Sequence, residues 1–148
     1  MERGLLSELY KWKASVSRKP LILEGARQVG KTFLLKEFAQ QAYKKMAYVS
    51  CDNNEKVNAI FSLDFNVVRL IQGLSAITSV DITPGDTLII LDEIQDCPKA
   101  LHALKYFCED APEYHIAVAG SLLGISLHTN ESFPVGKVDT LQLFPMTF

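Results

Sequence analysis

The stretch LILEGARQVGKT, residues 21–32, decides the fold, because an apolar segment runs directly into the pattern G-x-x-x-x-G-K-[ST]. A strand that leads into this pattern, followed by a helix, is typical of a loop that binds phosphate groups. Gly25 and Gly30 let the backbone turn tightly and direct its N–H groups inward, since neither residue has a β-carbon. The sequence predicts that the nucleotide is bound by Gly25, Ala26, Arg27, Gln28, Val29, Gly30, Lys31 and Thr32.

The last two residues of this loop have separate expected roles. Lys31 supplies a positive charge for the β and γ phosphates, and the hydroxyl of Thr32 is a hard oxygen ligand for Mg²⁺. The helix that starts here points the positive end of its dipole at the same anion. ATP and Mg²⁺ are therefore the expected cofactors. A guanine nucleotide is disfavoured, because no N-K-x-D pattern follows the apolar segment 115–119.

A second motif is TLIILDE at residues 87–93, which follows the turn sequence TPGD at 83–86. Its apolar residues predict a buried parallel strand that ends in two carboxylates. Asp92 is placed to hold the Mg²⁺ shell, and Glu93 is placed to orient or deprotonate a water molecule beside the γ phosphate. Acidic residues after a strand are often solvated turn residues, but the phosphate loop upstream favours the catalytic interpretation.

Apolar periodicity predicts a chain in which strands and helices alternate. Strands are expected at residues 21–24, 46–50, 87–91, 115–119 and 140–144, and helices at 5–18, at 34–42, twice within 53–76 and from Pro98 onward. The expected buried helix faces include Val16 and Val68. This alternation predicts an α/β fold of three layers, with a five-stranded parallel sheet covered by helices on both faces.

Composition limits the classes of protein to which the chain can belong. With 148 residues and 48% hydrophobic content, the chain can bury one ordinary core and should form one domain. The net charge of −2 and the absence of a basic stripe give no direct signal for nucleic acid or an anionic membrane. No signal sequence or membrane span is visible, so a cytoplasmic location is expected. Cys51, Cys97 and Cys108 lack metal or disulfide spacing and are expected to be buried apolar residues.

A third polar group follows the expected strand at 115–119. Gly120 and Ser121 place a hydroxyl at the sheet edge where the phosphate loop and the two carboxylates also end. Ser121 is expected to sense the γ phosphate or the attacking water, and the alternative is that it caps the next helix. Tyr10 and Trp12 could close over an adenine ring, although packing of the N-terminal helix is the better interpretation.

With these motifs in view, the chain resembles the P-loop ATPases of the catalytic-glutamate division, which includes the AAA-type enzymes. The segments GARQVGKT, LDEIQ, LKYFCE, AGSLLG, SFPVGKV and LFPMTF are similar to the N-terminal ATPase domain of a prokaryotic AAA-type family of ATP-binding proteins. The resemblance implies the strand order 5-1-4-3-2, with the Ser121 strand between the phosphate-loop and acid strands. It also places Gln95 in a family motif without a role. Where this chain has Lys137, members often carry Arg. A phosphate-sensing role for Lys137 is therefore the weaker interpretation, and a solvated loop lysine is the preferred one.

The resemblance also implies that residues 1–148 are the N-terminal ATPase domain of a longer protein, with a C-terminal domain of unknown function as a partner. The expected activity is Mg²⁺-dependent hydrolysis of ATP to ADP and phosphate, which drives or gates that partner. The alternative is a nucleotide-gated interaction switch with negligible hydrolysis. A small-molecule kinase is disfavoured, because no Arg-rich lid is visible. Efficient hydrolases of this division usually take an arginine from a neighbouring domain or subunit, so the isolated chain is expected to be slow, and an oligomer is one possible source of the arginine.

Overall fold

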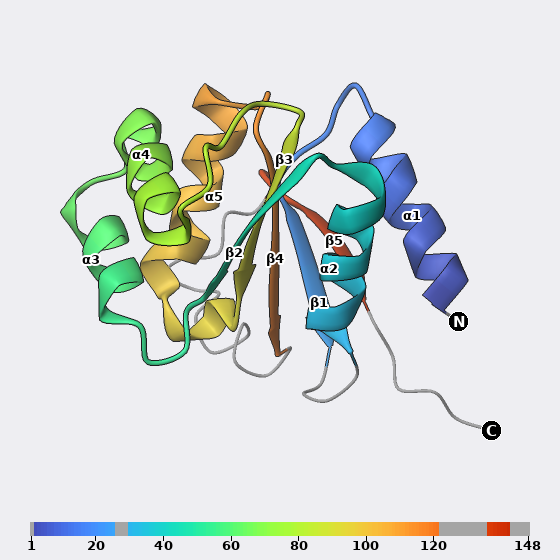
Figure 1. Ribbon diagram of the computed structural model, residues 1–148, viewed down its shortest axis with the longest axis horizontal. Coiled ribbons are helices and arrows are strands. Elements are labelled where there is room, and N and C mark those ends of the chain that lie inside the picture. Colours follow the sequence, from blue (N-terminus) through green and yellow to red (C-terminus); the bar gives the residue numbers. More distant parts are fainter. Residues whose placement is uncertain (1, 26–29, 122–135, 143–148) are drawn as a thin grey trace.

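Strands and helices alternate along the chain in the computed structural model, which describes residues 2–25, 30–121 and 136–142 (Figure 1). The helices are α1 (Glu2–Ala14), α2 (Lys31–Ala42), α3 (Glu55–Leu63), α4 (Val67–Thr78) and α5 (Pro98–Asp110), with one 3₁₀ turn, η1 (Ile94–Asp96). The strands are β1 (Leu21–Gly25), β2 (Lys45–Ser50), β3 (Thr87–Asp92), β4 (His115–Ser121) and β5 (Asp139–Gln142). Residues 143 and 144, expected in the last strand, lie outside the described residues.

All the strands belong to one parallel sheet of five strands in the order β2-β3-β4-β1-β5. From the other edge this order reads 5-1-4-3-2, which confirms the order implied by the resemblance. Parallel neighbours require crossover connections, and the helices between the strands supply them. As a result β4, a late strand in the sequence, lies between β1 and β3, and the carboxyl ends of these strands are adjacent.

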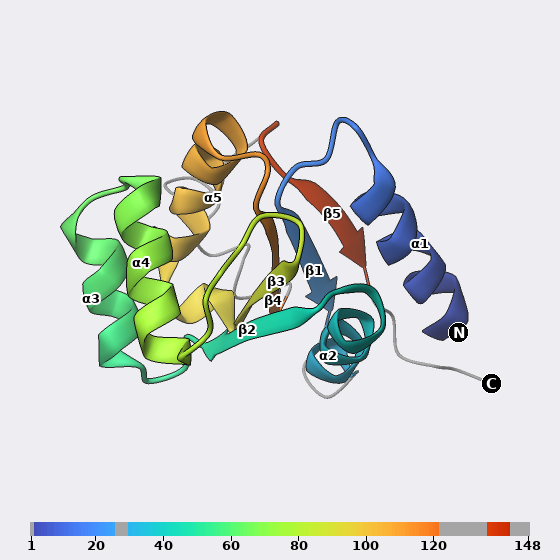
Figure 2. The same cartoon turned by 45° about the horizontal axis from the view of Figure 1, so that its top comes forward.

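Helices cover both faces of the sheet, as Figure 2 shows. On one face α1 and α2 pack over residues such as Ile90, with Phe38 of α2 at the centre. On the other face α3, α4 and α5 pack over residues such as Ile89, with Phe107 of α5 among them. Consecutive side chains of a strand point to opposite faces, and both faces are covered, so β3 is buried along its whole length and is apolar from its second residue to its fifth. The predicted three-layer α/β fold is confirmed.

Two expectations about buried helix faces were wrong. Helix α1 ends at Ala14 and not at residue 18, because the hydroxyl of Ser15 accepts a hydrogen bond from the N–H of Ser17 at 3.2 Å. Such local turns compete with helix continuation. Val16 therefore lies beyond the helix and is fully exposed. Val68 is also exposed, because the buried stripe of α4 runs along a neighbouring face of the helix.

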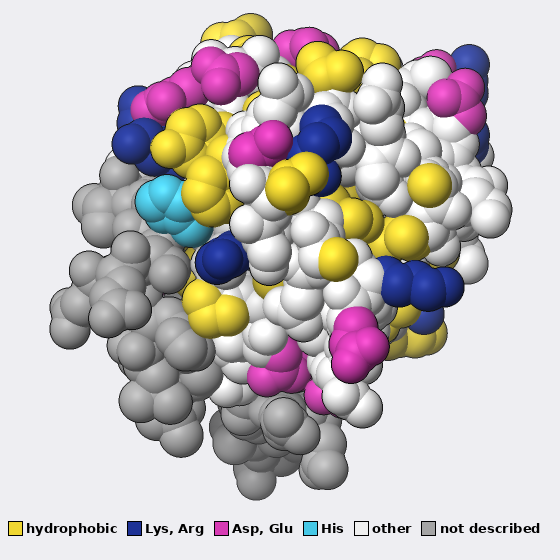
Figure 3. Space-filling view, turned by 90° about the vertical axis from the view of Figure 1, so that its left-hand side faces the viewer, with side chains coloured by type: hydrophobic (Ala, Val, Ile, Leu, Met, Phe, Trp, Pro, Cys, Tyr) yellow, Lys and Arg dark blue, Asp and Glu magenta, His cyan; other side chains and the backbone are white. Residues whose placement is uncertain are grey.

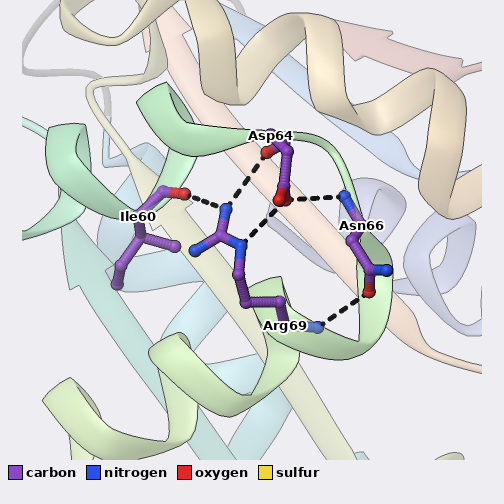
Figure 4. A network of polar contacts seen from close by, with 4 residues as sticks. All are labelled: Ile60, Asp64, Asn66 and Arg69. Atoms are coloured by element: carbon purple, nitrogen blue, oxygen red, sulfur yellow. Dashed lines mark hydrogen bonds and ion pairs between the residues drawn. The ribbon is translucent and has the colours of Figure 1, made fainter.

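The connection between α3 and α4 depends on Arg69 (Figure 4). Its guanidinium donates to the carboxylate of Asp64 at 2.8 Å and to the carbonyl oxygen of Ile60 near the end of α3. The side chain of Asn66 in turn caps α4 by accepting the backbone N–H of Arg69 at 3.1 Å. The Arg69 guanidinium and the N–H of Asn66 hold the pKa of Asp64 below its usual value. Arg69 is thus a structural residue that connects the end of α3 to the start of α4.

The surface over α3, α4 and α5 carries a mixture of side chains (Figure 3). Hydrophobic, acidic and basic groups alternate on the described part of this face, without a continuous basic patch. Within the described segments, no helix has both the length and the apolar character needed to cross a membrane.

Candidate nucleotide-binding site

The polar residues singled out in the sequence meet at one edge of the sheet, at the carboxyl ends of β1, β4 and β3 (bottom of Figure 1). Gly25, the last residue of β1, pairs in register with Ser121, the last residue of β4. Asp92 ends β3, which lies on the other side of β4. The strand order therefore gathers residues that are far apart in the sequence, at the edge where open α/β sheets bind ligands.

The phosphate loop runs from Gly25 to the start of α2. Gly30 has φ 85° and ψ 22°, a left-handed conformation that glycine adopts most easily. A β-carbon at this position would have no atom of the described residues within 4 Å, so among these residues it is the backbone conformation that favours glycine. Gly30 provides no side-chain cap, and the positive end of the α2 dipole lies beside the loop. The intervening residues, Ala26, Arg27, Gln28 and Val29, lie outside the described residues.

Lys31 bridges the two ends of this loop. Its side chain is buried, with 8% exposure, and its Nζ donates a hydrogen bond to the carbonyl oxygen of Gly25 at 3.1 Å. The ammonium group therefore extends from the first turn of α2 back to the end of β1. This position puts a compact positive charge at the loop that the sequence predicted to hold the β and γ phosphates.

Thr32 and Asp92 form the candidate Mg²⁺ site. The hydroxyl of Thr32 donates to Oδ2 of Asp92 at 2.6 Å, although 60 residues separate the two in the sequence. Asp92 is 6% exposed, and its Oδ1 accepts the backbone N–H of Glu93 at 2.9 Å. The described residues include no group of three or more His, Cys, Asp or Glu side chains that could hold a metal. A hydroxyl and one carboxylate fit Mg²⁺, which uses few protein ligands and completes its shell with water and phosphate oxygens.

Tyr48 is a member of this site that the sequence did not reveal. Its hydroxyl donates to Oδ2 of Asp92 at 2.8 Å, beside the bond from Thr32. The ammonium of Lys36 lies 4.0 Å from the centre of the Tyr48 ring and helps to hold it. Burial, then the hydrogen bond to Asp92 and the negative charges of Asp92 and Glu93, raise the pKa of Tyr48. Tyr48 therefore remains a hydrogen-bond donor at any working pH.

Glu93, Gln95 and Ser121 form a second polar group next to the candidate Mg²⁺ site. Glu93 has φ 53° and ψ 49°, which is unusual for a residue with a side chain. Its Oε1 accepts Nε2–H of Gln95 at 2.7 Å, and the amide oxygen of Gln95 accepts the backbone N–H of Ser121 at 3.3 Å. Residues 122–135, which include any helix that Ser121 would cap, lie outside the described residues. The sequence motif assigned Gln95 no role, but in the structure its side chain connects Glu93 to Ser121.

Two buried cysteines, Cys51 and Cys97, lie near the carboxyl end of β3. The backbone N–H of Cys51 donates to the carbonyl oxygen of Asp92 at 2.8 Å. A hydrogen bond from the thiol of Cys51, together with N–H groups at the start of α5, lowers the pKa of Cys97 to about 7, and the same pairing raises the pKa of Cys51. Both are buried, as expected, whereas Cys108 is only half-buried, and all three thiols are free.

Comparison with known proteins agrees with this geometry. A family model described as an AAA domain matches residues 17–148. The chain belongs to the AAA domain family. A search of curated proteins finds no match. Among solved structures, the Orc1 protein of Aeropyrum pernix, determined in complex with DNA, matches 99% of this chain with a TM-score of 0.55 and 20% identity. This AAA domain spans 44% of the Orc1 chain, and at this identity the likeness shows the fold alone.

Membership of the AAA family implies nucleotide binding, and it also helps to place the remaining candidate residues. Lys137 precedes β5, whose first residue pairs with the first residue of β1, so it lies at the opposite edge of the sheet from Gly25. There Lys137 forms an ion pair with Glu109 at 3.2 Å, which makes it a poor candidate for a phosphate sensor in this AAA domain.

The aromatic residues of α1 pack against the core of the AAA domain. The ring of Trp12 is buried, its indole N–H donates to the carbonyl oxygen of Lys19 at 2.7 Å, and its edge contacts Phe38 and His115. These contacts agree with the packing role preferred from the sequence and not with a contact to adenine. Trp12 therefore anchors α1 on α2 and the sheet.

Proposed function

We propose that this chain binds MgATP and hydrolyses it to ADP and phosphate, and that the nucleotide state drives or gates a partner domain of a longer protein. The observation that carries the proposal is the 2.6 Å contact between Thr32 Oγ1 and Asp92 Oδ2. It joins the end of the phosphate loop to the end of the acid strand, where a cation bound to β and γ phosphates needs its protein ligands. A structural hydrogen bond alone would not require Lys31 to lie at the same edge.

Different residues would bind the phosphates and the Mg²⁺ ion. The first N–H groups of α2 and the ammonium of Lys31 would hold the phosphates, with Lys31 leaving its contact to Gly25. Thr32 and Asp92 would hold Mg²⁺, which supplies electrostatic stabilisation of the phosphate oxygens when it is bound. Tyr48 would keep the carboxylate of Asp92 in a fixed orientation, because it donates to the same oxygen as Thr32.

Glu93 would act as the general base. Its carboxylate contacts Gln95, whereas that of Asp92 contacts Thr32 and Tyr48, so the two carboxylates would serve different tasks. Glu93 would accept the proton of the attacking water, while the remaining residues position the phosphate and stabilise its charge. Ser121, at the end of the strand between β1 and β3, would monitor the γ phosphate.

A complete hydrolase site needs a further cation for the transition state. Among the described arginine side chains, Arg18 donates to the carbonyl oxygens of Lys13 and Pro112, and Arg69 connects α3 and α4. Both are engaged away from the phosphate loop. This supports an arginine supplied by a neighbouring domain or subunit, with a slow basal rate in the chain alone.

Substitution of the proposed base tests this function. Glu93→Gln keeps the size of the side chain but cannot accept a proton, so single-turnover hydrolysis should fall roughly 10²-fold or more while ATP affinity is retained. Glu113→Gln, which changes an exposed glutamate far from the phosphate loop, is the matched control and should behave like the unaltered protein. Equal rates for the Glu93→Gln and unaltered proteins would reject Glu93 as the base: they would favour a different base if both proteins hydrolyse ATP, and the nucleotide-gated switch if neither does.

A further inference from the structure

The side chain of Gln95 uses both ends of its amide group within the candidate site. It is buried in the 3₁₀ turn after β3, where its Nε2–H donates to Oε1 of Glu93 at 2.7 Å. Its amide oxygen accepts the backbone N–H of Ser121 at 3.3 Å. One side chain therefore connects the proposed base to the last residue of β4.

The chemistry of these contacts explains why an amide is needed. An ionised carboxylate such as that of Glu93 only accepts hydrogen bonds, whereas the backbone N–H of Ser121 only donates. A neutral side chain that hydrogen-bonds to both groups must carry a donor and an acceptor, and the amide of glutamine carries both. Glutamate at position 95 would still accept from Ser121, but it would place a second carboxylate beside Glu93.

The link also reaches the phosphate loop. Ser121 pairs in register with Gly25, the residue where β1 ends and the loop begins. The carbonyl oxygen of Gly25 accepts the hydrogen bond from Lys31. Gln95 therefore joins the carboxylate of Glu93 to the part of the sheet that borders the bound phosphates.

We propose that Gln95 is a positioning residue, which holds the carboxylate of Glu93 against the end of β4 so that it faces the phosphate site. This inference rests on the hydrolysis proposed above. The left-handed backbone of Glu93 sets the direction in which its side chain leaves the chain, and Gln95 restricts the remaining rotations. The described residues donate no hydrogen bond to the second oxygen, Oε2, which remains to accept the proton of water.

Two substitutions at position 95 separate this role from a purely structural one. Gln95→Met conserves volume but removes both hydrogen bonds, whereas Gln95→Glu retains an acceptor for Ser121, loses the donor to Glu93 and adds a negative charge beside it. Single-turnover hydrolysis and ATP affinity are measured for each, at pH 8, with Gln40→Ala as the control for an exposed glutamine. We expect both position-95 variants to hydrolyse about 10-fold more slowly, with ATP dissociation constants within about twofold of the unaltered protein.

A double-mutant cycle with Glu93→Gln supplies the decisive comparison. If Gln95 acts through Glu93, Gln95→Met should cause no further loss once Glu93 is replaced by glutamine. Additive losses would overturn the inference, and so would an unchanged rate in Gln95→Glu, which also decides the case if Gln95→Met does not fold. If Glu93→Gln alone leaves the rate unchanged, Glu93 is not the base, so the proposed mechanism of hydrolysis fails and this inference fails with it. A failure confined to the position-95 variants leaves the proposed function intact.

Discussion

Replacement of Tyr48 by phenylalanine should weaken the use of Mg²⁺ without weakening the binding of nucleotide. The substitution removes only the hydroxyl that donates to Oδ2 of Asp92 at 2.8 Å, and the ring keeps its packing and its contact with Lys36. Asp92 retains the bonds from the hydroxyl of Thr32 and the N–H of Glu93. The carboxylate therefore stays in place but loses one of the groups that fix its orientation.

The size of the effect follows from the kind of bond removed. A hydrogen bond to a charged group contributes about 1.5–3 kcal/mol when it is buried. Tyr48 is only half-buried, so water can replace part of this contribution, and the low end of the range applies, about 1.5 kcal/mol, which corresponds to roughly a tenfold effect. Partners that orient metal ligands have effects of ~10–100-fold on metal affinity, which agrees with this value. Since the raised pKa of Tyr48 keeps its hydroxyl protonated, the effect should be the same throughout the neutral pH range.

A magnesium titration at fixed ATP concentration measures this effect. The Mg²⁺ concentration for half-maximal single-turnover hydrolysis should rise about tenfold in Tyr48→Phe, while ATP affinity in EDTA should be unchanged. Tyr10→Phe is the matched control, because it removes an exposed hydroxyl that donates to Gln41 at 3.2 Å. A half-saturating Mg²⁺ concentration that stays within about twofold of the unaltered value, in a variant that melts normally, would refute the role of Tyr48.

Three further outcomes are expected. Lys31→Ala should lower ATP affinity by roughly 100-fold or more in calorimetry, because the phosphates lose a close cation, and unchanged affinity in the folded variant would contradict the site. Gly30→Ala should destabilise the fold by about 1 kcal/mol in urea unfolding, because φ is 85° there, and an unchanged midpoint would argue against a left-handed Gly30. Burial, then the charges of Arg18 and Lys13, lower the pKa of His115 from 6.5 to about 4, so the unfolded chain takes up the proton first. Stability should therefore be complete above pH 6.5 and fall by at most about 3 kcal/mol as the pH drops toward 4, and His115→Gln should lose this dependence in melting experiments.

The sequence by itself determined the features that depend on neighbours in the chain. The stretch 21–32 carries a strand, a tight turn and a helix start within a dozen positions, so the phosphate loop can be recognised without knowledge of the rest of the fold. The segment 87–93 carries a buried strand and its acidic end in the same way. Alternating strands and helices also determined the three-layer α/β class, whereas the strand order came from the resemblance, because the same alternation is compatible with several orders.

Only the tertiary structure decided which residues meet across the sheet. Tyr48 lies 44 positions from Asp92, and Gln95 lies 26 positions from Ser121, so no local pattern connects either pair. Lys137 is the opposite case, a residue that a sequence motif suggested for the site and that the tertiary structure places elsewhere. It belongs to a glycine-containing segment that resembles a family motif, yet the parallel register of β5 and β1 places it at the edge of the sheet away from the phosphates. Strand order and register arise from packing over the whole domain, and they decide which side chains share an edge.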